Sequence, residues 1–160
     1  MLVNRCMKKN VITIPASATV GDAANLFCAN HVGTLPVVDE QGHLVGILLL
    51  RDLIHLIMPA FVDLIEDIDY VGDFGAMEDY DPAGEDLMRP ISEVMEEPTC
   101  VREDSGLVRA FSFIDKHQLL DLPVVNQAGQ LVGLASRVDM GRELLTNWWQ
   151  RMNGTVEKQT

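Results

Sequence analysis

The sequence contains an internal repeat, which constrains the fold more than any other feature. The tetrapeptide Leu-Pro-Val-Val occurs at residues 35–38 and again at residues 122–125. The same offset of 87 residues relates Leu-Val-Gly at 44–46 to Leu-Val-Gly at 131–133. Matches in one register indicate two copies of one structural unit. We therefore expect a duplicated fold rather than one continuous architecture.

The repeat divides the chain of 160 residues. We assign a first repeat to residues 2–58 and a second to residues 89–148. An acidic linker occupies residues 59–88, and residues 149–160 form a C-terminal tail.

Each repeat predicts the same order of elements. In the first, we expect a short strand at residues 11–14 and a helix capped by Thr19 and Asp22. Two strands follow on either side of a turn at residues 40–42, and a second helix begins near Arg51. The order β-α-β-β-α places the protein in the α+β class. Because one such unit leaves a sheet face uncovered, we expect the two to pack about a pseudo-twofold axis and share a core.

Charge is concentrated in one part of the chain. The protein has 24 acidic and 12 basic residues, a formal net charge of −12, yet residues 52–88 contain 11 acids and no Lys or Arg. The acidity disfavours binding to nucleic acid and to anionic membranes. The repeats themselves are nearly neutral, so they tolerate an anionic ligand.

Other features argue against several functional classes. The three cysteines are far apart and suggest neither a disulfide framework nor a zinc site. The longest apolar run, residues 44–50, is too short to span a bilayer, and no signal peptide is visible. We find no nucleophile–base pair and no glycine-rich phosphate loop. The sequence therefore predicts a cytoplasmic protein that is not an enzyme and holds no metal.

The motif with the most chemical content ends the last strand of the second repeat. Ser136 is placed to cap a helix, with Arg137 following and Asp139 at the third helical position. The first turn of a helix favours phosphate, and a carboxylate there can accept hydrogen bonds from ribose hydroxyls. These residues could hold a nucleoside phosphate. The alternative from the residues alone is that Ser136 and Asp139 only cap the helix.

The doubled pattern, LPVV followed by Gly-x-Leu-Val-Gly and a hydroxyl-x-x-Asp motif, resembles the CBS domain family, named after cystathionine β-synthase. The resemblance covers both repeats. It implies that they form one Bateman module, which commonly dimerises into a disc. It also implies binding of adenine nucleotides or related adenosyl compounds between the repeats, and regulation of another protein.

The resemblance also assigns residues to two clefts. For the first, around Asp139, it implies phosphate and ribose contacts from Ser136, Arg137 and Asp139. Contacts around the base are implied for Thr99, Leu122 and Pro123. The second cleft keeps Arg51 and Asp52 but has Leu49 in place of the hydroxyl residue, so we expect it to bind weakly or remain empty.

These observations support a regulatory module that binds an adenosyl ligand near Asp139 and relays binding to an unidentified partner protein. AMP, ADP, ATP and S-adenosylmethionine are the candidate ligands, no cofactor is required, and a homodimer is expected. The alternative is a ligand-free dimeric scaffold that docks a partner through its acidic linker.

Two further expectations concern the linker and the C-terminal end. The linker predicts an amphipathic helix over about residues 60–70, and residues 67–78 match an EF-hand loop only in part, because Val71 stands where an oxygen ligand is required. Trp148 and Trp149 follow the second repeat. Adjacent helical residues point to different sides, so we expect one to be buried and the other to meet a partner chain.

Overall fold

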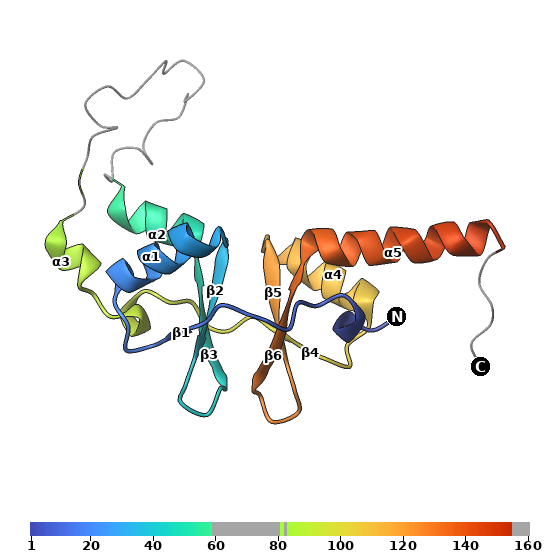
Figure 1. Ribbon diagram of the computed structural model, residues 1–160, viewed down its shortest axis with the longest axis horizontal. Coiled ribbons are helices and arrows are strands. Elements are labelled where there is room, and N and C mark those ends of the chain that lie inside the picture. The colour runs from blue at the N-terminus through green and yellow to red at the C-terminus, as the bar shows by residue number, and fades with distance from the viewer. Residues whose placement is uncertain (59–80, 82, 155–160) are drawn as a thin grey trace, which may run out of the picture.

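The computed structural model describes residues 1–58, 81 and 83–154, and these contain two three-stranded sheets with helices packed against them (Figure 1). The first repeat contains β1 (Ile14–Pro15), α1 (Val20–Asn30), β2 (Thr34–Val38), β3 (Leu44–Leu49) and α2 (Leu50–Ile57). The second contains β4 (Val101–Arg102), α4 (Leu107–Lys116), β5 (Asp121–Val125), β6 (Leu131–Ser136) and α5 (Arg137–Met152). A short helix between them, α3, spans Gly84–Leu87.

The two sheets have the same topology and the same register. In each, the first strand is parallel to the second and the second is antiparallel to the third. Leu35 pairs with Leu48 in the first sheet, and Leu122 pairs with Ala135 in the second. The duplicated α+β fold predicted from the repeat is therefore confirmed.

Local sequence signals set the starts of the helices. Thr19 and Asp22 form a reciprocal capping box at α1, as the sequence predicts. Ser136 caps α5 by accepting a hydrogen bond from the backbone N–H of Asp139. Leu49 occupies the same position before α2 and makes no side-chain cap.

The segment before each repeat's first strand packs against the other repeat. The N-terminal 3-10 turn, Val3–Arg5, lies on the second repeat, where the Val3 backbone N–H donates to the Ser105 carbonyl at 3.0 Å. The equivalent turn, Ile91–Glu93, lies on the first repeat, where the Ile91 N–H donates to the Ala18 carbonyl at 2.8 Å. This exchange joins the two units, and Figure 1 shows the N-terminus beside the second repeat.

The apolar core is divided between the repeats rather than fully shared. One cluster of buried residues belongs mainly to the first repeat and includes Ile91 from the exchanged turn. The other belongs mainly to the second repeat and includes Val3, Ile47 and Leu49 from the first. Our expectation of a single common core is thus corrected: each repeat has its own core, completed by side chains from its partner.

The exchanged segments cross the sheets at two glycines. Lys8 pairs with Leu134 on β6, and Glu96 pairs with Ile47 on β3. A Cβ atom at Gly133 would lie 2.6 Å from the Met7 sulfur, and one at Gly46 would lie 2.5 Å from the Met95 sulfur. Only glycine admits this approach without displacement of the crossing chain.

The turns between the last two strands of each repeat also meet. The Leu44 N–H donates to the Gly129 carbonyl at 3.1 Å, and the Leu131 N–H donates to the Gly42 carbonyl at 2.9 Å. Gly42 and Gly129 have φ values of 81° and 82°, which favour glycine. The reciprocal pairing relates the repeats by a pseudo-twofold axis.

The remaining expectations concern the acidic linker and the two tryptophans. The helix expected over residues 60–70 and the loop at 67–78 lie outside the described residues. Trp148 and Trp149 are both exposed, at 50% and 68%, so the prediction that one is buried within the chain is wrong. Helix α5 extends past the sheet, and its last turns have no neighbouring element in the described chain to cover them (Figure 1). Among the described helices, none has the length and apolar character needed to cross a membrane.

Candidate functional site

Ser136 and Asp139 form a compact pair at the start of α5. The Ser136 hydroxyl donates to Asp139 Oδ2 at 2.7 Å and accepts from the Asp139 backbone N–H at 3.0 Å. Both residues are partly buried. The pair caps the helix, as one of our two interpretations expects, and it also presents Asp139 Oδ1 at the helix N-terminus.

Lys8 brings a cation to this pair from the other end of the chain. Its ammonium lies 3.7 Å from Asp139 Oδ2, and its side chain is 68% exposed. The backbone pairing between Lys8 and Leu134, with N···O distances of 2.9 Å in both directions, fixes this approach. The cleft around Asp139 is therefore built from both repeats.

A cavity of about 200 Å³ adjoins Lys8 between the repeats. Its polar side chains come from three separate segments: the N-terminal crossing segment, the end of α1 with the start of β2, and the start of β5. They are Lys8, Asn10, His31, Thr34 and Asp121. Val11, Ile12 and Leu134 supply apolar wall. A cavity with apolar walls and a few polar groups is typical of a small-molecule site.

Asp121 is the second carboxylate at this cleft. It is the cross-strand partner of Ser136, so their side chains leave the same face of the sheet. Burial raises the pKa of the Asp121 carboxyl, the Thr34 hydroxyl and the Lys8 ammonium oppose that rise, and Asp139 adds to it. The Asp121 carboxyl therefore lies within electrostatic range of both Lys8 and Asp139.

Thr34 is the counterpart of Asp121 in the first repeat and lines the same cavity. It is 1% exposed. Its hydroxyl is close enough to Asp121 to lower that carboxyl's pKa, but it forms no hydrogen bond of normal geometry within the described structure. A buried hydroxyl without a well-formed partner is costly unless a ligand or water supplies one.

The Arg137 guanidinium contacts residues other than Ser136. It donates to the Leu119 carbonyl at 3.2 Å and lies 3.6 Å from Asp115. Arg137 also lines a depression along α5 with Val138 and Arg142. The structure thus gives Arg137 partners other than the phosphate group that the resemblance implies.

The residues that the resemblance places around the base, Thr99, Leu122 and Pro123, do not line the cavity that adjoins Lys8. Leu122 is fully buried in the core of the second repeat, and Pro123 is buried beside it on β5. Thr99 follows Glu96, which pairs with Ile47 on β3, so its segment runs along the first repeat. The position equivalent to Thr99 in the Asp139 cleft is held by Val11, which lines the cavity.

The cleft around Asp52 differs from the Asp139 cleft at its key positions. Leu49 is 4% exposed and packs into the core of the second repeat, where the other cleft has the Ser136 hydroxyl. Glu96 replaces Lys8 on the crossing segment. The Arg51 guanidinium lies 3.4 Å from Asp52 Oδ1 and donates to the Gln118 carbonyl at 3.2 Å. This cleft therefore lacks the hydroxyl and the lysine of its counterpart.

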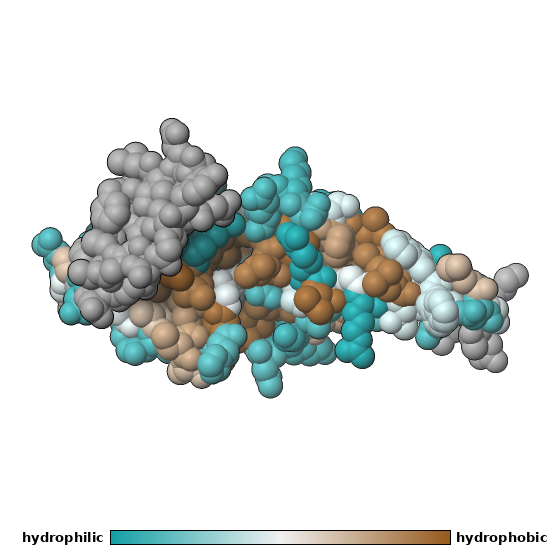
Figure 2. All heavy atoms as spheres, turned by 90° about the horizontal axis from the view of Figure 1, so that it is seen from above, coloured by the Kyte–Doolittle hydropathy of each residue, from teal (hydrophilic) through white to brown (hydrophobic). Residues whose placement is uncertain are grey.

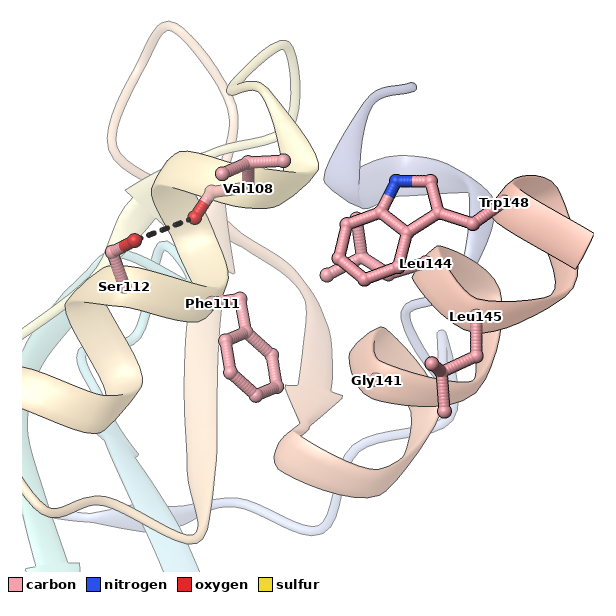
Figure 3. Close-up of a pocket in the computed structure, with 7 residues that line it drawn as sticks. All are labelled: Val108, Phe111, Ser112, Gly141, Leu144, Leu145 and Trp148. Atoms are coloured by element: carbon pink, nitrogen blue, oxygen red, sulfur yellow. Dashed lines mark hydrogen bonds between the residues drawn. The ribbon is translucent and has the colours of Figure 1, made fainter. Parts of the chain in front are cut away.

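A separate apolar groove runs between α4 and α5. It encloses about 290 Å³, and the Trp148 indole extends over it beside Leu144 (Figure 3). Val108 and Leu145 on its rim are 59% and 63% exposed. Figure 2 shows apolar side chains gathered over the helical face of the molecule, including this region.

Sequence reasoning identified Ser136 and Asp139 but not Lys8, Thr34 or Asp121. A signal for the last two exists, because each directly precedes a Leu-Pro-Val-Val motif. For Lys8, the only sequence signal is its alignment with Glu96 of the second repeat. In the described residues, no group of three or more His, Cys, Asp and Glu side chains is arranged to hold a metal ion.

Comparison with known proteins agrees with this architecture. The family model for the CBS domain matches residues 3–59 and 86–145. The CBS domain-containing protein YhcV of Bacillus subtilis is 31% identical over 146 residues, which cover 91% of this chain and 86% of that protein.

Two solved structures share the fold. CBSX2 from Arabidopsis thaliana, in its complex with AMP, has a TM-score of 0.67 and 26% identity, covering 91% of this chain and 97% of that one. The CBS domain pair of MJ0100, in complex with 5′-methylthioadenosine and S-adenosyl-L-methionine, has a TM-score of 0.66 and 22% identity, covering 92% and 98%. The second likeness shows the fold alone.

Proposed function

Because the chain belongs to the CBS domain family, we propose that it is a regulatory module that senses an adenosyl ligand in the cleft around Asp139. The observation that carries this proposal is the Ser136–Asp139 pair beside Lys8 and an adjoining cavity of about 200 Å³. The AMP complex of CBSX2, a relative of similar length, supports the same class of ligand.

The chemistry of the cleft suggests a role for each group. Asp139 Oδ1 can accept hydrogen bonds from ribose hydroxyls, since Oδ2 is engaged by Ser136. Val11 and Ile12 offer apolar surface to a base in the cavity, and Thr34 offers a buried hydroxyl. Thr99, Leu122 and Pro123 have no direct part in this arrangement.

We expect one ligand per chain. The Asp52 cleft has Leu49 in place of a hydroxyl and Glu96 in place of a lysine. Leucine cannot donate a hydrogen bond, and Glu96 in place of a lysine supplies no positive charge to attract phosphate. Arg51 is the one group there that favours an anion, and it already contacts Asp52 and Gln118.

Thermal unfolding in the presence of AMP, ADP, ATP or S-adenosylmethionine tests the proposal. A ligand that binds the folded state at 100 times its Kd stabilises it by about 2.7 kcal/mol, which raises Tm by several degrees. The shift should be lost in Asp139→Ala and kept in the matched variant Asp52→Ala. A Tm that none of the four compounds changes at millimolar concentration contradicts the proposal.

The homodimer belongs to the same proposal, with the groove between α4 and α5 as its contact. Gly21 on α1 is the repeat counterpart of Val108 on the groove rim, and Gly21 lies against Leu87 of α3. Within the described residues, α3 therefore covers this face of the first repeat, and no corresponding element covers the matching face of the second repeat. A second copy, presenting the same exposed Leu145 and Trp148, would bury both faces at once. Ligand binding near the start of α5 would then reach the dimer contact along that helix and change docking of a partner protein.

Sedimentation velocity tests the dimer. Leu145→Glu places a charge in the groove and should shift the protein from dimer to monomer. Met88→Glu, at a residue that is 71% exposed away from the groove, is the control and should leave the dimer intact. A wild-type protein that sediments as a monomer at all concentrations contradicts this part of the proposal.

A further inference from the structure

Asp121 occupies the place where the 5′ substituent of a nucleotide is expected. Directly opposed residues on neighbouring antiparallel strands have Cβ atoms about 4.5–5.5 Å apart on one face. Asp121 stands in this relation to Ser136, the hydroxyl that the family motif assigns to phosphate. The first repeat has the neutral Thr34 at the same position, opposite Leu49. The second repeat has therefore placed a carboxylate beside its phosphate-binding motif.

The two cations near this carboxylate each have another partner, although Lys8 still lowers the pKa of Asp121. Lys8 pairs with Asp139, and Arg137 is held by Asp115 and the Leu119 carbonyl. The Ser136 hydroxyl already donates a hydrogen bond to Asp139. Within the described part of the chain, no Lys or Arg forms an ion pair with Asp121. A phosphate dianion here would face two carboxylates and one shared lysine.

A second observation indicates that the cleft is built for a ligand. The Thr34 hydroxyl is buried, lines the cavity with Asp121 and has no well-formed hydrogen bond. It adds a polar contact that carries no charge. The cavity thus combines a neutral hydroxyl with a carboxylate that forms no ion pair within the described residues, a combination that suits a cation with apolar neighbours better than it suits a phosphate.

We propose that Asp121 makes this cleft selective for adenosyl ligands whose 5′ substituent is cationic, the sulfonium class, over those that carry a 5′-phosphate. The inference rests on the proposed function, which it narrows. Asp139 holds the ribose, and the Asp121 carboxylate faces the charge attached to the 5′ carbon. Attraction between opposite charges in a partly buried site, and repulsion between like charges, act together to separate the two classes.

The test compares S-adenosylmethionine with S-adenosylhomocysteine, which differ by one methyl group and the sulfonium charge. Calorimetric titration of the wild type should show S-adenosylmethionine binding about tenfold more tightly than S-adenosylhomocysteine and more tightly than AMP, a factor that corresponds to about 1.4 kcal/mol. In Asp121→Asn the first ratio should fall to about threefold or less, and AMP should bind more tightly than it does to the wild type. Asp121→Thr, which copies the residue of the first repeat, should behave in the same way.

The possible results distinguish the selectivity for sulfonium ligands from the proposed function on which it rests. A wild type that binds AMP more tightly than S-adenosylmethionine overturns the selectivity and leaves the adenosyl site in place. The same holds if both Asp121 variants keep the wild-type ratio. Absence of binding by any of the three compounds overturns the selectivity and the proposed function together. Circular dichroism of each variant verifies that the fold is intact.

Discussion

Ser136 and Leu49 occupy equivalent positions in the two repeats, yet their side chains have different structural roles. Ser136 caps α5 and fixes one oxygen of Asp139. Leu49 makes no cap and buries its side chain in the neighbouring core. A single position thus decides whether the start of a helix presents polar groups to a cleft or contributes to packing.

The Ser136 cap has a measurable contribution to stability. Ser136→Ala removes the acceptor for the Asp139 backbone N–H, and we expect the free energy of unfolding to fall by about 1 kcal/mol. Ser136→Thr keeps a hydroxyl and should cost less than about 0.5 kcal/mol. Urea denaturation followed by circular dichroism measures both, and equal stability of the alanine variant and the wild type would exclude the cap as a stabilising contact.

Asp121 should give stability a dependence on pH. Because its pKa is raised in the folded protein, the folded state binds the proton more tightly than the unfolded state does. Its ionisation therefore lowers stability as pH rises from the ordinary aspartate value through the raised one. Asp121→Asn removes this effect, so the variant should gain stability relative to the wild type between pH 3 and pH 7. Urea titrations at several pH values measure the difference, and a difference that stays constant with pH would refute the explanation.

At this scale the sequence predicts part of the site. Ser136 and Asp139 lie three residues apart, so a local motif reveals them. Lys8 and Asp121 join them only through the exchanged N-terminal segment and the β5–β6 register, which no local pattern encodes. The contacts of Arg137 with Asp115 and the Leu119 carbonyl are likewise not visible in the local motif.

At the level of the elements, the repeats are joined where the exchanged segments cross β3 and β6. Val3 and Ile91 each complete the core of the other repeat. The crossing requires close approach at Gly46 and Gly133. The repeat aligns Met7 with Met95, but the sequence alone does not show that these residues contact the opposite repeat.

Gly133→Ala tests this contact. The new methyl group would lie 2.6 Å from the Met7 sulfur and 3.0 Å from the Lys8 carbonyl oxygen, so the Met7 side chain must move and the crossing backbone must yield slightly. We expect a loss of about 1–3 kcal/mol in the free energy of unfolding. Gly84→Ala, where no atom lies within 4 Å of the added carbon, is the control and should change stability by less than about 0.5 kcal/mol. A Gly133→Ala protein as stable as the control would show that the crossing is looser than described.

At the scale of the whole molecule, the fold is symmetric and the surfaces are not. The repeated Leu-Pro-Val-Val and Gly motifs predict two equal sheets, and the registers agree. The two clefts differ in the hydroxyl, in the charge on the crossing segment and in the residue before Leu-Pro-Val-Val. The two helical faces differ because α3 covers only the first. The two repeats therefore share one framework and differ in the residues of their clefts and helical faces.

We predict that one adenosyl ligand binds each chain, at Asp139. Isothermal titration with S-adenosylmethionine measures this most directly, because it reports the number of sites as well as the affinity. We predict one site per chain in the wild type and in Asp52→Ala, and no detectable heat of binding in Asp139→Ala. Two sites per chain, or a site that is lost in Asp52→Ala and retained in Asp139→Ala, would contradict it.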